Sequence, residues 1–205
     1  MKTRALLLLA FLVCSGGTTA HAKNHARNHA ALTASQGLAG TTVLIVRHAE
    51  KPDSGTGLTA AGEQRARAYV AYFSNFTFNG KSARPDYLIA AADSHASQRP
   101  RLTIEPLSHA LHLQIEQNFA DKQFAQLASE LQNGKHGKTV LIAWHHGEIP
   151  ALMRALGVDP TTVLPAKKWP ANVFGWVVAI HYNHRGQPRR AILIHENLMP
   201  DDQGQ

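Results

Sequence analysis

The sequence predicts a three-layer α/β/α domain with a mostly parallel central sheet, and three observations support this class. Short apolar runs alternate with longer amphipathic stretches between residues 41 and 157. Chains that alternate strands and helices in this way usually form a parallel sheet covered by helices on both faces. The 205 residues suffice for one domain with a sizeable core. Two further β-type runs near the C-terminus predict antiparallel edge strands.

The first 22 residues match a secretory signal peptide. Lys2 and Arg4 precede an apolar run over residues 6–13 that is too short to span a bilayer, and residues 20–22 read Ala-His-Ala, a cleavage pattern. We therefore expect cleavage after residue 22, a periplasmic or secreted protein, and no membrane attachment after cleavage.

The mature chain has no thiol, because Cys14 is the only cysteine. Disulfides are thereby excluded, although the chain suits an oxidising compartment. Its 19 basic and 14 acidic residues give a net charge of +5, which favours small anionic ligands. No basic run or aromatic-interleaved strand suggests a nucleic acid partner.

Residues 23–40 lack apolar periodicity, and we interpret them as a flexible linker before a domain over 41–200 and a tail over 201–205. His25 and His29 would share one face of a helix and could hold a metal there. A solvated leader is the preferred interpretation, because no further ligand lies nearby in sequence.

The first predicted strand covers residues 41–46 and is followed by a loop over 52–57. Thr59 is placed to cap a helix that runs to about residue 73. Its apolar positions follow the helical spacing i, i+3, i+4, i+7, at Ala66, Tyr69, Val70 and Phe73.

The middle of the chain continues the alternation. A short strand is predicted over 87–91, a helix over 99–111 with a kink at Pro106, a helix over 123–131 and a buried strand over 139–143. The next helix covers 149–156 and ends at Gly157. Strands over 173–181 and 190–195 flank a turn.

Candidate functional residues follow three of the predicted parallel strands. Arg47 and His48 come directly after the first, Arg99 follows the second, and His145 and His146 follow the strand at 139–143. The carboxyl ends of parallel strands meet at one edge, where open α/β sheets bind ligands. An imidazole is a nucleophile near neutral pH and a guanidinium binds anions, so this combination indicates phosphoryl chemistry.

These segments resemble the histidine phosphatase superfamily (phosphoglycerate mutase-like), in its secreted bacterial branch with an Arg-His-Ala-Glu-Lys motif. The resemblance rests on motifs in the family's order between residues 41 and 157. They are Arg47-His48-Ala49-Glu50-Lys51 with Leu58-Thr59-Ala60-Ala61-Gly62, then Arg99-Pro100-Arg101-Leu102-Thr103, then Val140 to Gly147.

The resemblance implies a phosphoglycerate mutase-like fold and a phosphomonoester hydrolase. His48 would attack phosphorus and become transiently phosphorylated, while Arg47, Arg99 and a second histidine hold the phosphoryl oxygens. The implied partner is a small phosphorylated substrate or phosphate, with no cofactor and no metal.

The second histidine is either His145 or His146. An alignment through Ile149-Pro150 selects His145, whereas alignment of His-Gly-Glu selects His146. We prefer His146, because Gly147 would leave room for the phosphate beside it.

Two carboxylates are candidates for the general acid, Glu148 and Asp121. Glu148 alternatively supplies negative charge to a helix start, and Asp121 alternatively caps the helix at residue 123.

Three further positions near these motifs have expected roles. Glu50 is expected to orient the arginines. The loop residues that either donate hydrogen bonds to substrate or form a flexible turn are Ser54, Gly55, Thr56 and Gly57. His95 replaces the family's usual serine four residues before Arg99.

Three other functions remain open at this point. A mutase would use the same fold, although an export signal argues against a cytoplasmic intermediate as substrate. A non-catalytic phosphate- or phosphoprotein-binding module would keep the arginines without a working acid. A metal-binding protein would account for 13 histidines but not for their position beside arginines at strand ends.

Overall fold

A computed structural model describes residues 35–202 and gives them a six-stranded sheet in the order β10-β9-β2-β8-β5-β6. Neighbouring strands among β2, β8, β5 and β6 are parallel, whereas β9 pairs antiparallel with both β2 and β10. The bounds are β2 Thr42–Arg47, β8 Thr139–Trp144, β5 Tyr87–Ala90, β6 Ile115–Glu116, β9 Trp176–Tyr182 and β10 Pro188–His195. The predicted mostly parallel sheet is confirmed.

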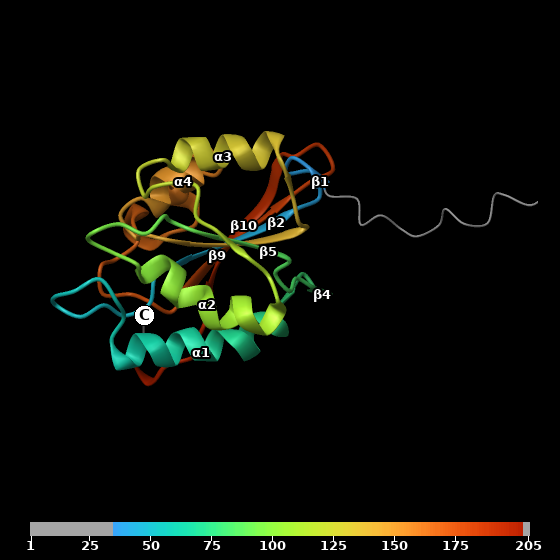
Figure 1. The fold of residues 1–205 in the computed structure, drawn as a ribbon. Helices are drawn as coiled ribbons and strands as arrows, with labels where there is room; N and C mark the ends of the chain where they lie inside the picture. Colours follow the sequence, from blue (N-terminus) through green and yellow to red (C-terminus); the bar gives the residue numbers. More distant parts are fainter. Residues whose placement is uncertain (1–34, 203–205) are drawn as a thin grey trace, which may run out of the picture. The chain divides into compact units, whose positions relative to one another are not determined.

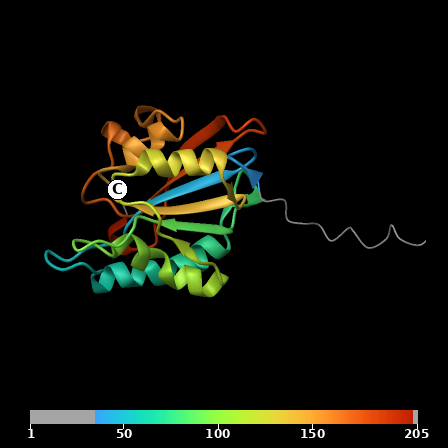
Figure 2. The same cartoon turned by 45° about the horizontal axis from the view of Figure 1, so that its top comes forward.

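Helices cover both faces of this sheet, so the predicted three layers are also present (Figure 1, Figure 2). One face carries α1 Ala60–Ser74 and α2 Arg99–Leu111, and the other carries α3 Phe124–Asn133 and α4 Ile149–Ala155. Short 3-10 turns complete the helical segments at η1 Pro160–Thr162, η2 Pro165–Lys167 and η3 Pro200–Asp202. Thr59 caps α1 as predicted, because its hydroxyl oxygen accepts a hydrogen bond from the N–H of Gly62.

The alternation of side chains along β2 explains the two cores. Val43 and Ile45 pack with α3 and α4, whereas Leu44 and Val46 pack with α1 and α2. All four are fully buried. A strand covered on both faces is therefore apolar at consecutive positions, which is the pattern that the sequence shows at 43–46.

Several short elements were not predicted. The pairs are β1 Ser35–Gln36 with β7 Lys135–His136, and β3 Thr77–Phe78 with β4 Lys81–Ser82. Two-residue strands are too short to show a periodicity. Residues 35–40, which we had assigned to the linker, include β1 and the buried Leu38. Of the two C-terminal strands only β10 lies at the sheet edge, since β9 lies between β10 and β2.

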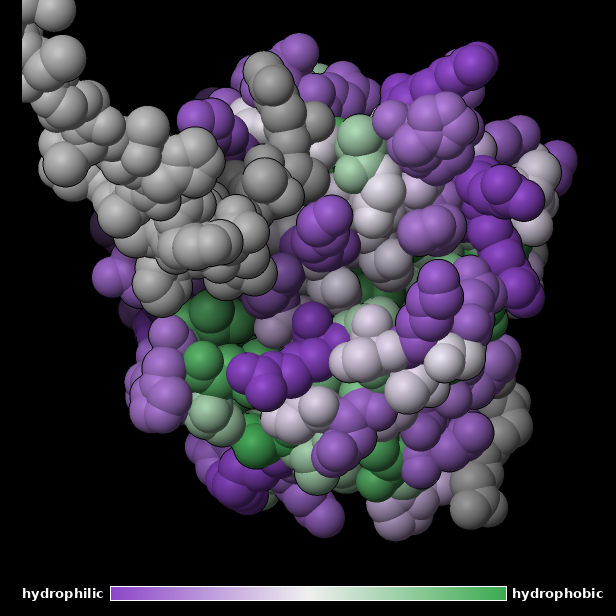
Figure 3. Space-filling model, turned by 90° about the vertical axis from the view of Figure 1, so that its right-hand side faces the viewer, coloured by the Kyte–Doolittle hydropathy of each residue, from purple (hydrophilic) through white to green (hydrophobic). Residues whose placement is uncertain are grey.

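The parallel strands all begin at one edge of the sheet and end at the opposite edge. The parallel strands end at the left of Figure 1, beside the loop that follows β2. The edge where β2 and β8 begin faces the viewer in Figure 3 and carries mainly hydrophilic side chains.

Within residues 35–202, no helix combines the length and the apolar character needed to cross a membrane.

Candidate active site

Arg47 ends β2 as a fully buried cation whose side chain is held by the segment before β9. Its Nη1 donates to the carbonyl oxygens of Ala171 and Val173, each at 2.8 Å, and its guanidinium lies 3.8 Å from the ring centroid of Phe174. Burial lowers the pKa of Arg47 to about 10, so it stays charged at neutral pH. Among the described residues its Nε and Nη2 have no hydrogen-bond partner, and buried donors of this kind favour an anion.

His48 is placed by the backbone and held in one tautomer. The backbone N–H of His48 donates to the backbone carbonyl of Trp144 at 2.9 Å, and this bond joins His48 to the end of β8. Its Nδ1 lies 2.8 Å from the carbonyl oxygen of Ala49. A carbonyl only accepts, so Nδ1 carries the proton and Nε2 keeps its lone pair. Burial lowers the pKa of His48 to about 3, which leaves the ring neutral and Nε2 available as a nucleophile.

Thr103 joins the start of α2 to the residue after His48. Its hydroxyl donates to the carbonyl of Arg99 and accepts from the N–H of Ala49, both at 2.8 Å. This pair of bonds explains the four-residue spacing of the arginine and the threonine in the motif, since i and i+4 are neighbours on a helix.

Arg99 is held at the start of α2 by two backbone carbonyls. Nη1 donates to Gly55 at 2.9 Å and Nη2 to Ala96 at 3.2 Å, while Nε has no partner among the described residues. Burial lowers the pKa of Arg99 from its ordinary value. The N–H of Gln98 donates to the carbonyl of Thr56. Gly55 and Thr56 thus position the start of α2 through their carbonyls, and Ser54 is exposed. Donation from this loop to a substrate stays a prediction.

The structure places His145, not His146, against His48. The ring centroids of His48 and His145 lie 5.3 Å apart at an interplanar angle of 67°. Burial lowers the pKa of His145, and the charges of Arg99 and Arg47 act in the same direction. The pKa of His146 is also lowered by burial, then by Arg47, His145 and Lys51. This geometry favours the alternative that we had not preferred.

The physical reason lies in the end of β8. His145 directly follows Trp144, whose carbonyl accepts from His48, so the next side chain reaches the nucleophile. Our argument for His146 relied on Gly147. A Cβ added to Gly147 would meet no atom within 4 Å, and Gly147 is exposed, so the site does not require a glycine there.

Of the two candidate acids, Asp121 is coupled to His145. Its negative charge raises the pKa of His145 against the effect of burial. Its backbone carbonyl accepts from the indole Nε1–H of Trp144 at 3.0 Å, which ties this segment to β8. The N-cap of α3 is Gln123, so the alternative role of Asp121 as its cap is not realised.

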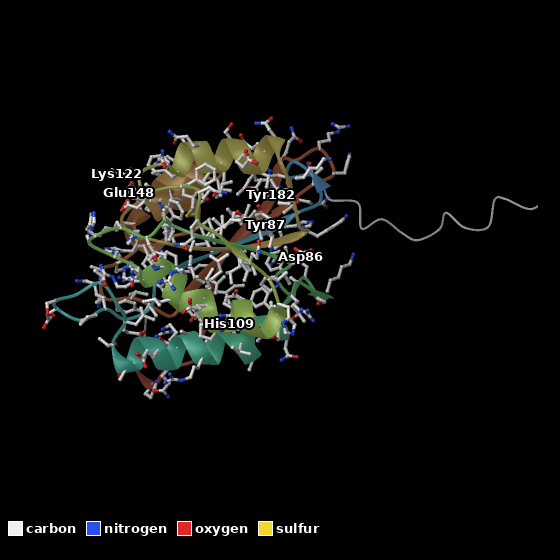
Figure 4. All side chains as sticks on the ribbon, viewed as in Figure 1. Asp86, Tyr87, His109, Lys122, Glu148 and Tyr182 are labelled. Atoms are coloured by element: carbon white, nitrogen blue, oxygen red, sulfur yellow. The ribbon has the colours of Figure 1, made fainter. Side chains whose placement is uncertain are left out.

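Glu148 is the N-cap residue of α4, but its side chain makes no capping hydrogen bond. Its N–H donates to the carbonyl of His145 at 3.0 Å. Figure 4 labels Glu148 and Lys122 at the edge where the parallel strands end. Glu148 therefore belongs to this edge and remains a candidate acid.

Sequence reasoning missed Arg65, a buried cation on α1. It pairs with Glu50 at 2.6 Å, Asp202 at 2.7 Å and Glu196 at 3.1 Å. Burial raises the pKa of Glu196 to about 8 even though Arg65 opposes this shift. The hydroxyl of Tyr69 donates to Glu196 at 2.8 Å. We call Arg65, Glu50, Glu196, Asp202 and Tyr69 the Arg65 cluster.

The Arg65 cluster corrects the role expected for Glu50. Its carboxylate binds the guanidinium of Arg65, while on Arg47 it acts only through its charge, which raises the pKa of that residue. A sequence signal was available, because Arg65 has the helical spacing of the buried residues Tyr69 and Phe73.

Arg101, next to the site in sequence, points elsewhere as expected. It donates to Asp93 at 2.9 Å and to Glu105 at 2.6 Å. His95 is exposed, and Ser94 forms the turn before α2 by accepting from the N–H of Ser97 at 3.1 Å.

No metal site is found in the part of the chain that the structure describes, where no three or more His, Cys, Asp or Glu residues are grouped to hold an ion. His25 and His29, the other metal candidates, lie outside the described residues.

No protein-family model and no curated protein sequence matches this chain. Solved structures do match it. A putative phosphohistidine phosphatase SixA from Agrobacterium tumefaciens is 19% identical with a TM-score of 0.50, over 76% of this chain and 96% of that one. A protein histidine phosphatase SixA complexed with tungstate is 14% identical with a TM-score of 0.48, over 76% and 97%.

A phosphoglycerate mutase from Plasmodium falciparum is 16% identical with a TM-score of 0.48, over 77% of this chain and 91% of that one. At these identities the likeness concerns the fold alone. The chain therefore has the fold of the Agrobacterium structure, the expected phosphoglycerate mutase-like arrangement of a mostly parallel sheet between helices.

Proposed function

We propose that the protein is a phosphomonoester hydrolase that works through a phosphohistidine on His48. One observation carries the proposal. A neutral histidine with Nε2 unprotonated lies beside two arginines, Arg47 and Arg99, that both keep buried N–H groups without a partner. A nucleophile next to unsatisfied cationic donors is suited to a phosphoryl group.

The reaction has two displacements. In the first, Nε2 of His48 attacks phosphorus, the bond from phosphorus to the ester oxygen breaks, and the leaving oxygen takes a proton. In the second, water attacks phosphorus, the bond from phosphorus to Nε2 breaks and returns its electron pair to His48, and the proton that water loses goes back to the carboxylate that protonated the leaving group, so that orthophosphate is released. Two easier steps replace one difficult step.

The other side chains stabilise charge and supply the proton. Arg47, Arg99 and His145 bind the phosphoryl oxygens, on which charge develops in each transition state. Removal of one such donor typically lowers kcat by about 100-fold or more. The leaving group takes its proton from Asp121, whose negative charge acts on His145, or from Glu148, whose backbone N–H donates to the carbonyl of His145.

We further propose that the enzyme acts in the periplasm or outside the cell. The support is the pattern of residues 1–22, with its basic start, its apolar run and its Ala-His-Ala end.

The test uses p-nitrophenyl phosphate with excess chelator. Wild type and His109→Ala, a control at an exposed histidine of α2, should hydrolyse it equally, whereas His48→Ala should show no turnover. Circular dichroism must show the same fold in all three, and His48→Asn is the substitute if the alanine variant fails to fold.

Rapid quenching with labelled substrate should trap an acid-labile phosphate on His48 of the wild type. Hydrolysis without this label, or hydrolysis that the chelator abolishes, would overturn the phosphohistidine mechanism. A folded wild type that binds vanadate but hydrolyses no phosphomonoester would instead be a phosphate-binding module.

A further inference from the structure

An open concave surface of about 770 Å³ lies where β2 and β8 begin, at the edge opposite His48. It is bounded by these strand starts, the β3–β4 hairpin and the turn between β9 and β10. Figure 3 faces this edge, and Figure 4 labels Tyr182, one of its lining residues, there. We call this surface the basic cavity.

The lining of the basic cavity is strongly cationic. It contains four cations and two imidazoles, namely Lys81, Lys138, Arg189, Arg190, His181 and His184. No aspartate or glutamate is among its described lining residues. The four cations have no ion pair within residues 35–202. Asp86 lies nearby, but its carboxylate accepts from the backbone N–H groups of Lys138 and Thr139.

Two lining residues, Arg190 and His181, are held by neutral side chains that leave the positive charge of the lining uncompensated. Nη1 of Arg190 donates to Oδ1 of Asn79 at 2.6 Å, and the guanidinium lies 5.8 Å from the ring centroid of Phe78. Nδ1 of His181 lies 3.1 Å from the hydroxyl oxygen of Thr42. Neutral groups thus orient Arg190 and His181, whereas Lys81, Lys138 and Arg189 are exposed, so the positive charge of the lining remains available to a ligand.

We propose that the basic cavity binds a compact polyanion with two or three linked phosphoryl groups. The cations come from three separate segments, so one ligand must present several negative groups to meet them together. The volume fits a small organic or inorganic ligand and far exceeds one orthophosphate. Converging positive charges repel one another in the free protein, and a bound polyanion removes this repulsion.

The proposal is independent of the phosphatase assignment, because the two sites lie at opposite ends of β2. Calorimetric titration with inorganic triphosphate tests it, in protein whose active site is saturated with vanadate. The cavity variant is Lys138→Gln with Arg189→Gln. The control is Arg67→Gln with Arg154→Gln, which removes the same charge at exposed positions of α1 and α4, outside the cavity and the turn that bounds it.

We expect one triphosphate per chain and binding that weakens steeply with salt. The cavity variant should bind at least about tenfold more weakly than wild type, a difference of about 1.4 kcal/mol, while the control stays within about twofold. Adenosine triphosphate should bind at least as well as inorganic triphosphate, since both carry the phosphoryl chain.

Three results would overturn the proposal. They are equal losses in the cavity variant and the control, orthophosphate binding as tightly as triphosphate, and an absence of triphosphate binding to vanadate-saturated wild type. Thermal unfolding gives a readout on the wild type alone, because a ligand that binds only the folded state raises Tm. An unchanged Tm at saturating triphosphate would likewise contradict the inference.

Discussion

Replacement of Arg65 by methionine should destabilise the fold more than replacement of any exposed arginine. The substitution keeps most of the apolar stem and removes the charge. The carboxylate of Asp202, whose side chain is 1% exposed and whose pKa Arg65 lowers against the effect of burial, then loses its cation. Removal of one partner from a buried ion pair costs about 3–5 kcal/mol, because a buried charge stays uncompensated. This is a large share of the 5–15 kcal/mol that is typical for total stability.

The matched control lies two residues away on the same helix. Arg67 pairs with Glu63 at 3.6 Å, and both side chains are more than half exposed. Exposed pairs contribute about 0.2–1 kcal/mol, so Arg67→Met should be almost neutral. Urea unfolding monitored by circular dichroism measures both variants. Equal midpoints for Arg65→Met and Arg67→Met would refute the buried cluster.

The pH dependence of this cluster supplies a second check. Burial raises the pKa of folded Glu196 from 4.5 to about 8, so the folded state binds this proton more tightly than the unfolded state. The stabilisation is therefore complete below about pH 4.5 and is lost as pH rises through about 8. Glu196→Gln should remove this decline, and the stability of wild type and variant should be compared at pH 6 and pH 9. A variant that declines as steeply as wild type would assign the effect to another group.

The remaining predictions concern the proposed active site and processing. Arg99→Lys should lower kcat/KM by about 100-fold, because an ammonium group cannot reproduce the planar, two-pronged guanidinium. The control Arg101→Lys should have little effect. Similar losses in the two variants would mean that Arg99 does not bind the phosphoryl group. His145→Ala should weaken vanadate inhibition more than His146→Ala, because only His145 packs against His48, and the reverse order of inhibition constants would restore the Gly147 argument. The exported protein should begin at Lys23 by N-terminal sequencing, and a start that retains the apolar run would contradict the predicted cleavage.

Local patterns were enough to predict most of the fold. The helix over 99–111 has the predicted bounds, and the strands at β2, β5 and β8 agree within a residue at each end. These elements are long and strongly patterned, and each carries its signal within its own residues. The two-residue strands β1 and β7 lack such a signal, since their pairing depends on residues about 100 positions apart in the chain.

The sequence by itself determined that Arg47, His48, Arg99 and the histidines after β8 follow parallel strands. Their convergence at one edge then follows from strand direction alone. Their order along the chain also carried the resemblance on which the proposed chemistry rests.

Only the tertiary structure decided which side chains meet. His145 was selected over His146 by the hydrogen bond that joins the end of β8 to His48, which local sequence does not encode. Arg65 reaches Glu196 and Asp202 across separations of 131 and 137 residues. The burial of a charge depends on every segment packed around it, and the distances between those segments exist only in the folded chain.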